Sequence, residues 1–338
     1  MSKVLYKLAT LCMVGVFGLS GCDSGKSFEP KDAFELNIKP TTYQGEIISQ
    51  SRYGATLEDG HFIDKDGISK IVLPKGFIYL NSTSSKVLCS NSQSLRVIDK
   101  KSQKYRDIDT SQSVVSATLH NNLIAYILSN NSFGLYSLKS SKKLVEQQTS
   151  SSFAINTKAA SPIFVDNLAV MPMLDGKLVI VDINDIESAN VVYISSSRVF
   201  NNVIFLSRIG DTLISATPTK LISLGEAGEF DYSTNLVDIA INGRYIYLFA
   251  KDGEIIKFDI KLQKVASKRF DYARYSAVSS FGDKVVAFDK NGALIVLDSS
   301  LSKFRIYDIG EVDSPVYISG DKLYKDGEII DLSKISYK

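Results

Sequence analysis

The chain has few of the residues that many enzymes use for nucleophilic or metal chemistry. Its 338 residues include two histidines, three cysteines and no tryptophan. His61 and His120 lie far apart in the sequence, and no G-x-S-x-G stretch is present. The C-x-x-C and H-E-x-x-H spacings of zinc sites are absent, as is a phosphate-cradling glycine loop. We therefore expect no catalytic residue, no metal site, no cofactor and no enzymatic activity.

The N-terminal segment predicts a lipoprotein signal peptide over residues 1–21. Lys3 and Lys7 precede an apolar run, residues 8–19, which is too short to cross a bilayer as a helix. The run ends in LSGC, which resembles the lipobox of bacterial lipoproteins and makes Cys22 the expected site of lipidation. The alternative is an ordinary signal peptide with a chance cysteine.

Processing at Cys22 removes the small excess of positive charge. Without Lys3 and Lys7, the 39 basic residues become 37, against 37 acidic residues. A neutral chain has no electrostatic footprint for nucleic acid, so no nucleic-acid partner is expected. Cys89 would be the remaining free thiol, and we expect it to act as a small core residue.

The lipid anchor implies a location in the bacterial cell envelope, with the folded part facing the periplasm. We favour the outer membrane. Asp23 resembles the inner-membrane retention signal of enteric lipoproteins, so the inner membrane stays an alternative. Residues 22–43 are polar and lack sustained alternation, which predicts a flexible tether after the lipidated cysteine. The folded domain is expected at residues 44–338.

A strand-and-turn repeat then predicts an all-β fold. Short apolar runs alternate with Asp-Gly, Asn-Gly and Gly-Asp pairs, which suit two-residue hairpin turns. Aligning the units on the turn before their third strand gives eight copies of the repeat. The residues at this turn are Gly67, Gln93, Ser132, Gly176, Thr219, Gly253, Gly292 and Gly327. Units of about forty residues are typical of propeller blades.

We therefore predict a single β-propeller of eight four-stranded blades after the signal peptide and tether. The first unit lacks room for a fourth strand in this alignment, and the last unit ends after its third. QGEIISQ at residues 44–50 is the expected closing strand of the final blade. Seven blades is the alternative, if units 1 and 8 share one sheet.

An aspartate follows the turn glycine by six residues in the clearest copies, namely Asp182, Asp259 and Asp298. Such carboxylates raise the question of a metal site. Equivalent positions in different blades are too far apart to share an ion, so each aspartate is expected to end a strand and bond its own following turn. His120, at the end of VVSATLH, is likewise expected to cap a strand end.

The repeat unit [DN]G-x-Φ-Φ-x-Φ-D, with Φ apolar, resembles that of pyrroloquinoline-quinone-type propellers. The resemblance is strongest in LDGKLVIVDI, KDGEIIKFDI and KNGALIVLDS. This chain lacks the tryptophan that closes the family's repeats by docking between blades. Phe270 and Tyr307 occupy comparable outer-strand stretches. The absent tryptophan also argues against a bound quinone cofactor.

The propeller, lipobox and tether together resemble the BamB family of envelope lipoproteins. That resemblance implies a non-enzymatic scaffold that binds a BamA-type protein and supports outer-membrane β-barrel assembly. The alternative is an accessory protein of a periplasmic or membrane-bound respiratory complex. Two basic stretches, Lys142-Lys143 and residues 261–269, are expected on solvated hairpins and outer strands, and a partner-binding role for them stays open.

Overall fold

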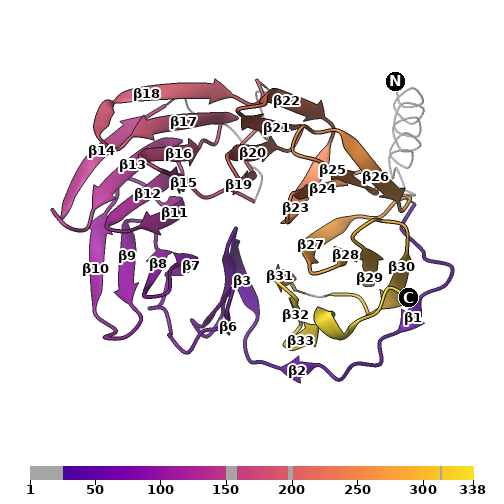
Figure 1. Ribbon diagram of the computed structural model, residues 1–338. Coiled ribbons are helices and arrows are strands. Elements are labelled where there is room, and N and C mark those ends of the chain that lie inside the picture. Colours follow the sequence, from indigo (N-terminus) through magenta and orange to yellow (C-terminus); the bar gives the residue numbers. More distant parts are fainter. Residues whose placement is uncertain (1–25, 150–157, 197–200, 313) are drawn as a thin grey trace, which may run out of the picture.

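The described residues form a closed ring of eight β-sheets (Figure 1). The computed structural model describes residues 26–149, 158–196, 201–312 and 314–338. In each sheet, four antiparallel strands follow one another from the centre outward, which is the arrangement of a propeller blade. The prediction of an all-β propeller with eight blades is confirmed. Units 1 and 8 form separate sheets, so the alternative of seven blades is wrong.

In blades 1 to 7, the chain forms the innermost strand first and the outermost strand last. Blades 1 to 4 consist of β3–β6 (Ile47–Ser51, Gly54–Leu57, Phe62–Asp64, Gly67–Ile68), β7–β10 (Ile78–Ser82, Lys86–Ser90, Ser94–Asp99, Tyr105–Asp109), β11–β14 (Val114–His120, Leu123–Leu128, Ser132–Ser137, Lys142–Gln148) and β15–β18 (Ile163–Val165, Leu168–Pro172, Lys177–Asp182, Asp185–Tyr193). Blades 5 to 7 consist of β19–β22 (Phe205–Ile209, Thr212–Thr217, Lys220–Gly225, Gly228–Ser233), β23–β26 (Leu236–Asn242, Tyr245–Ala250, Glu254–Phe258, Lys264–Arg269) and β27–β30 (Tyr275–Phe281, Lys284–Asp289, Ala293–Asp298, Phe304–Asp308).

Blade 8 combines the two ends of the described chain. Its inner strands are β31 (Tyr317–Ser319), β32 (Lys322–Lys325) and β33 (Glu328–Asp331), and its outer strand is β2 (Thr41–Thr42). A further short strand, β1 (Phe34–Glu35), pairs in parallel with β30 at the edge of blade 7. A single turn of 3-10 helix, Leu332–Lys334, follows β33.

Hydrophobic burial decreases from the middle of a blade to its edge, as the repeat predicted. In blade 6, β24 (YIYLFA) is almost entirely buried, whereas β26 (KVASKR) is mostly exposed. The outer strand covers the edge of the sheet with charged side chains, which discourages edge-to-edge association.

The core of the described structure is divided among the interfaces between blades. Each of the eight apolar clusters joins two neighbouring blades, so that the ring has one cluster at every interface. The cluster between blades 6 and 7, for example, contains Phe249 and Tyr275, whose rings pack edge to face at 5.7 Å. A blade on its own would leave both apolar faces exposed, so the ring is stable only when it is closed.

Phenylalanine and tyrosine take the place of tryptophan between the last blades. Phe270 follows β26 and packs edge to face on Phe304 of β30, with ring centroids 5.2 Å apart. Tyr307 on β30 is buried in the cluster between blades 7 and 8, and its hydroxyl donates to the Ser336 carbonyl at 2.7 Å. Both residues therefore dock between blades, as their positions in the repeat suggested.

Blade 1 corrects the repeat alignment. Gly67, aligned as the turn before a third strand, lies in the outer strand β6. The turn before the third strand, β5, is formed around Gly60, and the step from Gly60 to Gln93 is 33 residues instead of 26. Blade 1 thus has all four strands, but β5 and β6 contain only three and two residues. Such short strands carry too little alternation to be recognised in the sequence.

The closing strand also differs from the prediction. The stretch 44–50 does not complete blade 8, because most of it belongs to β3, the innermost strand of blade 1. The closing strand is β2, in which Thr41 and Thr42 pair with Ile329 and Glu328. A bond from the Tyr43 amide to the Gly327 carbonyl, at 2.8 Å, extends this pairing.

Residues 26–43, which we call the strap, follow the outside of blades 7 and 8 in Figure 1. Phe28 packs on Phe270 with centroids 6.1 Å apart, Phe34 lies against Tyr307, and Leu36 and Ile38 pack on the cluster between blades 7 and 8. The expected tether of residues 22–43 is therefore corrected over its described part, because these apolar side chains bind to the propeller.

Candidate functional site

Arg52 projects from the turn between β3 and β4 and links blade 1 to the inner strands of distant blades. Its Nη1 donates to Asp238 Oδ1 on β23 at 2.7 Å, and its Nη2 donates to the Ile239 carbonyl at 3.1 Å. The guanidinium carbon lies 4.7 Å from the centre of the Phe205 ring at the start of β19. One side chain of blade 1 thus contacts blades 5 and 6 across the ring.

Asp238 is the buried centre of this ion cluster. Its Oδ2 accepts from Lys158 Nζ at 2.7 Å, and its side chain is only 9% exposed. Burial alone would raise the pKa of Asp238, but the charges of Arg52 and Lys158 outweigh burial and hold the pKa well below its usual range. Burial disfavours the charged form of Arg52, but the neighbouring Asp238 carboxylate favours it. The net effect raises the pKa of Arg52. Asp238 and Arg52 are therefore both ionised.

Two tyrosines lie close to this cluster. Burial raises the pKa of Tyr53 and of Tyr317, although the Arg52 charge acts in the opposite direction on both. Both phenols therefore remain protonated at neutral pH and can donate hydrogen bonds.

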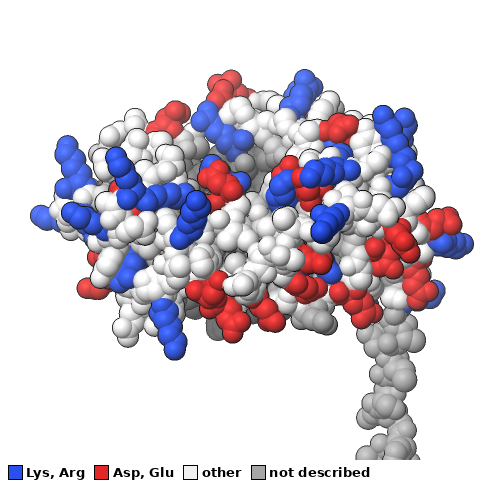
Figure 2. Space-filling model, turned by 90° about the horizontal axis from the view of Figure 1, so that it is seen from below, with Lys and Arg blue, Asp and Glu red and all other residues white. Residues whose placement is uncertain are grey.

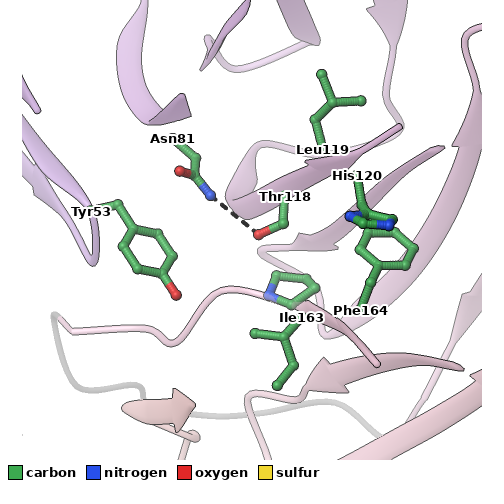
Figure 3. Close-up of a pocket in the computed structure, with 8 residues that line it drawn as sticks. Tyr53, Asn81, Thr118, Leu119, His120, Ile163 and Phe164 are labelled. Carbon is green, nitrogen blue, oxygen red and sulfur yellow. Dashed lines mark hydrogen bonds between the residues drawn. The ribbon is translucent and has the colours of Figure 1, made fainter. Parts of the chain in front are cut away.

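A pocket of about 240 Å³ opens beside Tyr53, among the inner strands of blades 1 to 4 (Figure 3). From blade 1 to blade 4, its wall consists of Tyr53, Asn81, Thr118, Leu119, His120, Pro162, Ile163 and Phe164. Tyr53 faces the other labelled residues from the opposite side of the pocket. Pockets that combine apolar walls with a few polar groups are typical of binding sites.

The polar groups of this pocket are held in place by neighbouring strands. Asn81 Nδ2 donates to Thr118 Oγ1 and to the Ala117 carbonyl, both at 3.2 Å. His120 stacks on Phe164 with ring centroids 5.4 Å apart, as Figure 3 shows. Asn81 Oδ1 also accepts from the Ser82 amide at 2.8 Å, so this amide shapes the pocket wall, while the stacked rings offer an apolar surface for contact.

The histidines do not form a catalytic pair. His120 lies at the end of β11, as expected, and His61 pairs with Asp59 in a turn of blade 1, with Nδ1 2.8 Å from Oδ2. Within the described ranges, neither ring is hydrogen-bonded to a serine or cysteine side chain. No group of three or more histidine, cysteine or acidic residues capable of holding a metal ion occurs in that part of the chain either.

The repeated aspartates have the structural role predicted for them. Asp182 Oδ1 accepts from the Asn184 amide at 2.9 Å, and Asp259 Oδ1 accepts from the amides of Lys261 and Gln263. Asp298 Oδ1 likewise accepts from two amides of the turn that follows it. Each carboxylate therefore shapes the turn between the third and fourth strands of its own blade.

Of the two cysteine predictions, only the one for Cys89 concerns a residue that the structure describes. Cys22 and Asp23 lie outside the described residues. Cys89 is a free, buried thiol on β8, as expected, and burial raises its pKa to about 12. Since the thiolate is the reactive form, Cys89 is an inert core residue in the folded chain.

The basic stretches occupy outer strands, as expected. Lys142 and Lys143 begin β14 of blade 3, and Lys143 pairs with Glu146 at 3.0 Å. The stretch 261–269 covers the last turn and outer strand of blade 6, where Lys264 and Arg269 both pair with Glu254.

The sequence analysis missed Arg52 and Asp238, which are 186 residues apart in the chain. One signal was available for Asp238. In LVDIAI it interrupts an otherwise apolar inner strand, and a buried carboxylate needs a charged partner. Nothing in the local sequence identifies Arg52 as that partner.

The comparisons with known proteins show a relative in sequence and a shared fold. No protein-family model matches the chain. Plasminogen-binding protein PgbB from Helicobacter pylori, strains J99 and 26695, is 28% identical over 379 aligned positions, which cover 97% of this chain and 69% of PgbB. No helix among the described residues is long and apolar enough to cross a membrane.

Solved structures resemble this chain at low sequence identity. BamB from Moraxella catarrhalis has a TM-score of 0.65 at 12% identity and covers 86% of this chain and 98% of its own. The C-terminal WD40 domain of Sif2 has a TM-score of 0.64 at 12% identity, over 88% of this chain and 99% of that domain. The BamB-like architecture inferred from the repeat is thus confirmed as a fold.

Proposed function

We propose that this chain is a non-catalytic, lipid-anchored propeller that binds a BamA-type protein and acts as a scaffold in outer-membrane β-barrel assembly. The observation that carries the proposal is the eight-bladed ring itself, which matches BamB over 98% of that protein. The sequence adds the LSGC lipobox at residues 19–22. A rigid ring with most apolar surface buried between blades can present its loops and outer strands to a partner without rearranging.

Crosslinking in membranes tests this proposal directly. The lipidated chain is crosslinked in membranes of the bacterium that encodes it, purified, and its attached proteins are identified by mass spectrometry. We expect a BamA-type protein. Recovery of a respiratory complex instead would favour the accessory role and contradict the assembly role.

The anchor is tested by replacing the predicted lipidation site. A Cys22→Ala variant is expected to lose the lipid and the mature-size membrane form, while a Cys89→Ala variant keeps both. Persistence of lipid and of the mature-size membrane form in Cys22→Ala would show that the lipobox assignment is wrong.

A second candidate function is binding of plasminogen. The similarity to PgbB, a protein named for this binding, extends over 97% of the chain and therefore includes every blade. Immobilised full-length chain is exposed to plasminogen, with albumin as the control, and surface plasmon resonance measures binding. Saturable binding of plasminogen alone supports this function, and equal signals for both proteins reject it.

A further inference from the structure

A second recess, distinct from the pocket in Figure 3, lies on the outer part of the ring between blades 2 and 3. It has a volume of about 360 Å³ and is bounded by the start of β10 and by the turns of blade 3 around Asn122 and Leu138. We call it the blade 2–3 cleft. Its size is within the range of about 300–1,000 Å³ that is usual for binding sites.

The cleft is positively charged. Lys86, Lys104 and Arg106 line it, together with one carboxylate, Asp99. Asp99 already accepts from Lys86 Nζ at 3.2 Å and from the amide and hydroxyl of Ser102. These hydrogen bonds lower the pKa of Asp99 to about 2, so it is ionised, and the cleft retains two positive charges in excess.

The guanidinium of Arg106 is held in place by hydrogen bonds and still has N–H donors that can bind a ligand. Its Nη1 donates to the Leu138 carbonyl at 2.8 Å and to Ser141 Oγ at 3.0 Å, which ties the guanidinium of blade 2 to blade 3. Its Nε and Nη2 make no hydrogen bond within the described residues. A guanidinium edge that is held in place loses little freedom when it binds a carboxylate through two parallel hydrogen bonds.

Exposed lysines surround the cleft. Lys101, Lys104, Lys139 and Lys142 have no acidic partner in the part of the chain that the structure describes. Figure 2 shows how positive and negative side chains are distributed on one side of the molecule. Blue side chains dominate the left of the ring, the side on which β10 and β14 lie in Figure 1, while red side chains gather along the lower edge. The whole chain has nearly balanced charge, whereas positive side chains are in excess around this cleft.

We propose that the blade 2–3 cleft binds an acidic peptide segment of the partner protein. This inference rests on the protein-binding function proposed above and specifies its chemistry. Carboxylates of the segment would pair with Arg106 and Lys104, and the surrounding lysines would attract the segment at longer range. A peptide is favoured over an anionic membrane because the donors of Arg106 line a recess between two blades, which a chain can enter and a flat bilayer cannot.

The test uses purified full-length chain in detergent and a fluorescent peptide of alternating glutamate and glycine. Fluorescence anisotropy measures binding at low ionic strength. The charge-reversed variant K101E/K104E is expected to bind about tenfold more weakly, because two attractions become repulsions. K251E/K290E, which makes the same change in net charge at two exposed lysines of blades 6 and 7, is the matched control and should bind as the unchanged chain does.

Three outcomes would overturn the proposal. The first is equal weakening in both double variants, which would indicate attraction by net charge alone. The second is equal affinity for a glutamine–glycine peptide, which carries no carboxylates. The third is binding to phosphatidylglycerol vesicles that depends on Lys101 and Lys104, without binding of the peptide.

Failure of this inference and failure of the proposed function give different results. If K101E/K104E still recovers the partner in the membrane crosslinking experiment, the partner binds elsewhere and the cleft assignment is wrong, although the scaffold function stands. If the unchanged chain binds the acidic peptide specifically but recovers no BamA-type protein, the cleft assignment stands and the assembly function is wrong.

Discussion

Blades 6 and 7 differ from blades 8 and 1 in how the chain specifies them. Blades 6 and 7 have long strands, glycine turns and fourteen buried residues in the cluster between them. Only five buried residues form the cluster between blades 8 and 1. Local sequence therefore encodes the regular blades, whereas closure of the ring depends on residues that are distant in the sequence.

Polar bonds and the strap compensate for the small apolar cluster at the closure. Gln50 Nε2 donates to the Val316 carbonyl and Ser319 Oγ donates to the Asp64 carbonyl, both at 2.9 Å, and each bond joins blade 1 to blade 8 or its entry. The strap covers the outer side of blades 7 and 8, and Arg52 connects blade 1 to blades 5 and 6. Closure is a cooperative property of several weak links, so each link offers a way to test it.

Removing the strap should have the largest effect. Replacing residues 26–43 by a glycine–serine sequence of equal length deletes β1, β2 and the packed side chains of five apolar residues, Phe28, Phe34, Leu36, Ile38 and Tyr43. At about 1 kcal/mol for each partly buried side chain, the free energy of unfolding should fall by about 5 kcal/mol. Denaturant unfolding measures the change. An unchanged midpoint would show that the strap does not hold the ring closed.

Breaking the ion cluster of Arg52, Asp238 and Lys158 should have the second largest effect on stability. Asp238→Ala leaves Arg52 and Lys158 without their shared carboxylate, and the expected loss is about 4 kcal/mol. Asp211→Ala is the matched control, because its pair with Arg208 lies on the surface and its side chain is 78% exposed. The control should lose less than about 1 kcal/mol. Similar losses in the two variants would show that the pairing across the ring adds nothing beyond a surface pair.

Two glycines of blade 6 test how strictly a regular blade depends on its turns. Gly253 has φ +84°, and a Cβ there would overlap the Phe270 carbonyl oxygen, so Gly253→Ala should cost about 3 kcal/mol. Gly243 has φ +59° with open space around it, so Gly243→Ala should cost about 1 kcal/mol. Thermal unfolding of both variants measures the difference. Equal costs would mean that backbone strain alone, and not the contact with Phe270, decides the effect.

The same contrast explains what the sequence could predict. The turn pairs, the alternation and the aspartates after the third strands are local signals, and they predicted eight blades and the turn-capping role of Asp259 correctly. The pairing of β2 with β33 joins residues nearly 290 positions apart through a two-residue strand, which has no recognisable pattern. The partnership of Arg52 with Asp238 and the cleft at Arg106 likewise depend on how blades are placed beside one another.

The last prediction concerns the pH dependence of stability that Asp238 contributes. Its pKa in the folded chain is depressed, so its stabilising contribution is fully present above the unfolded pKa, near about 4, and is lost as the pH falls toward the folded value. Between pH 4 and pH 2 this loss should be about 2 kcal/mol, at about 1.4 kcal/mol per pH unit. The stability difference between the unchanged chain and Asp238→Asn should therefore shrink by that amount over this range in denaturant titrations. A constant difference would show that the carboxylate is not held ionised by Arg52 and Lys158, and that the link across the ring is steric rather than electrostatic.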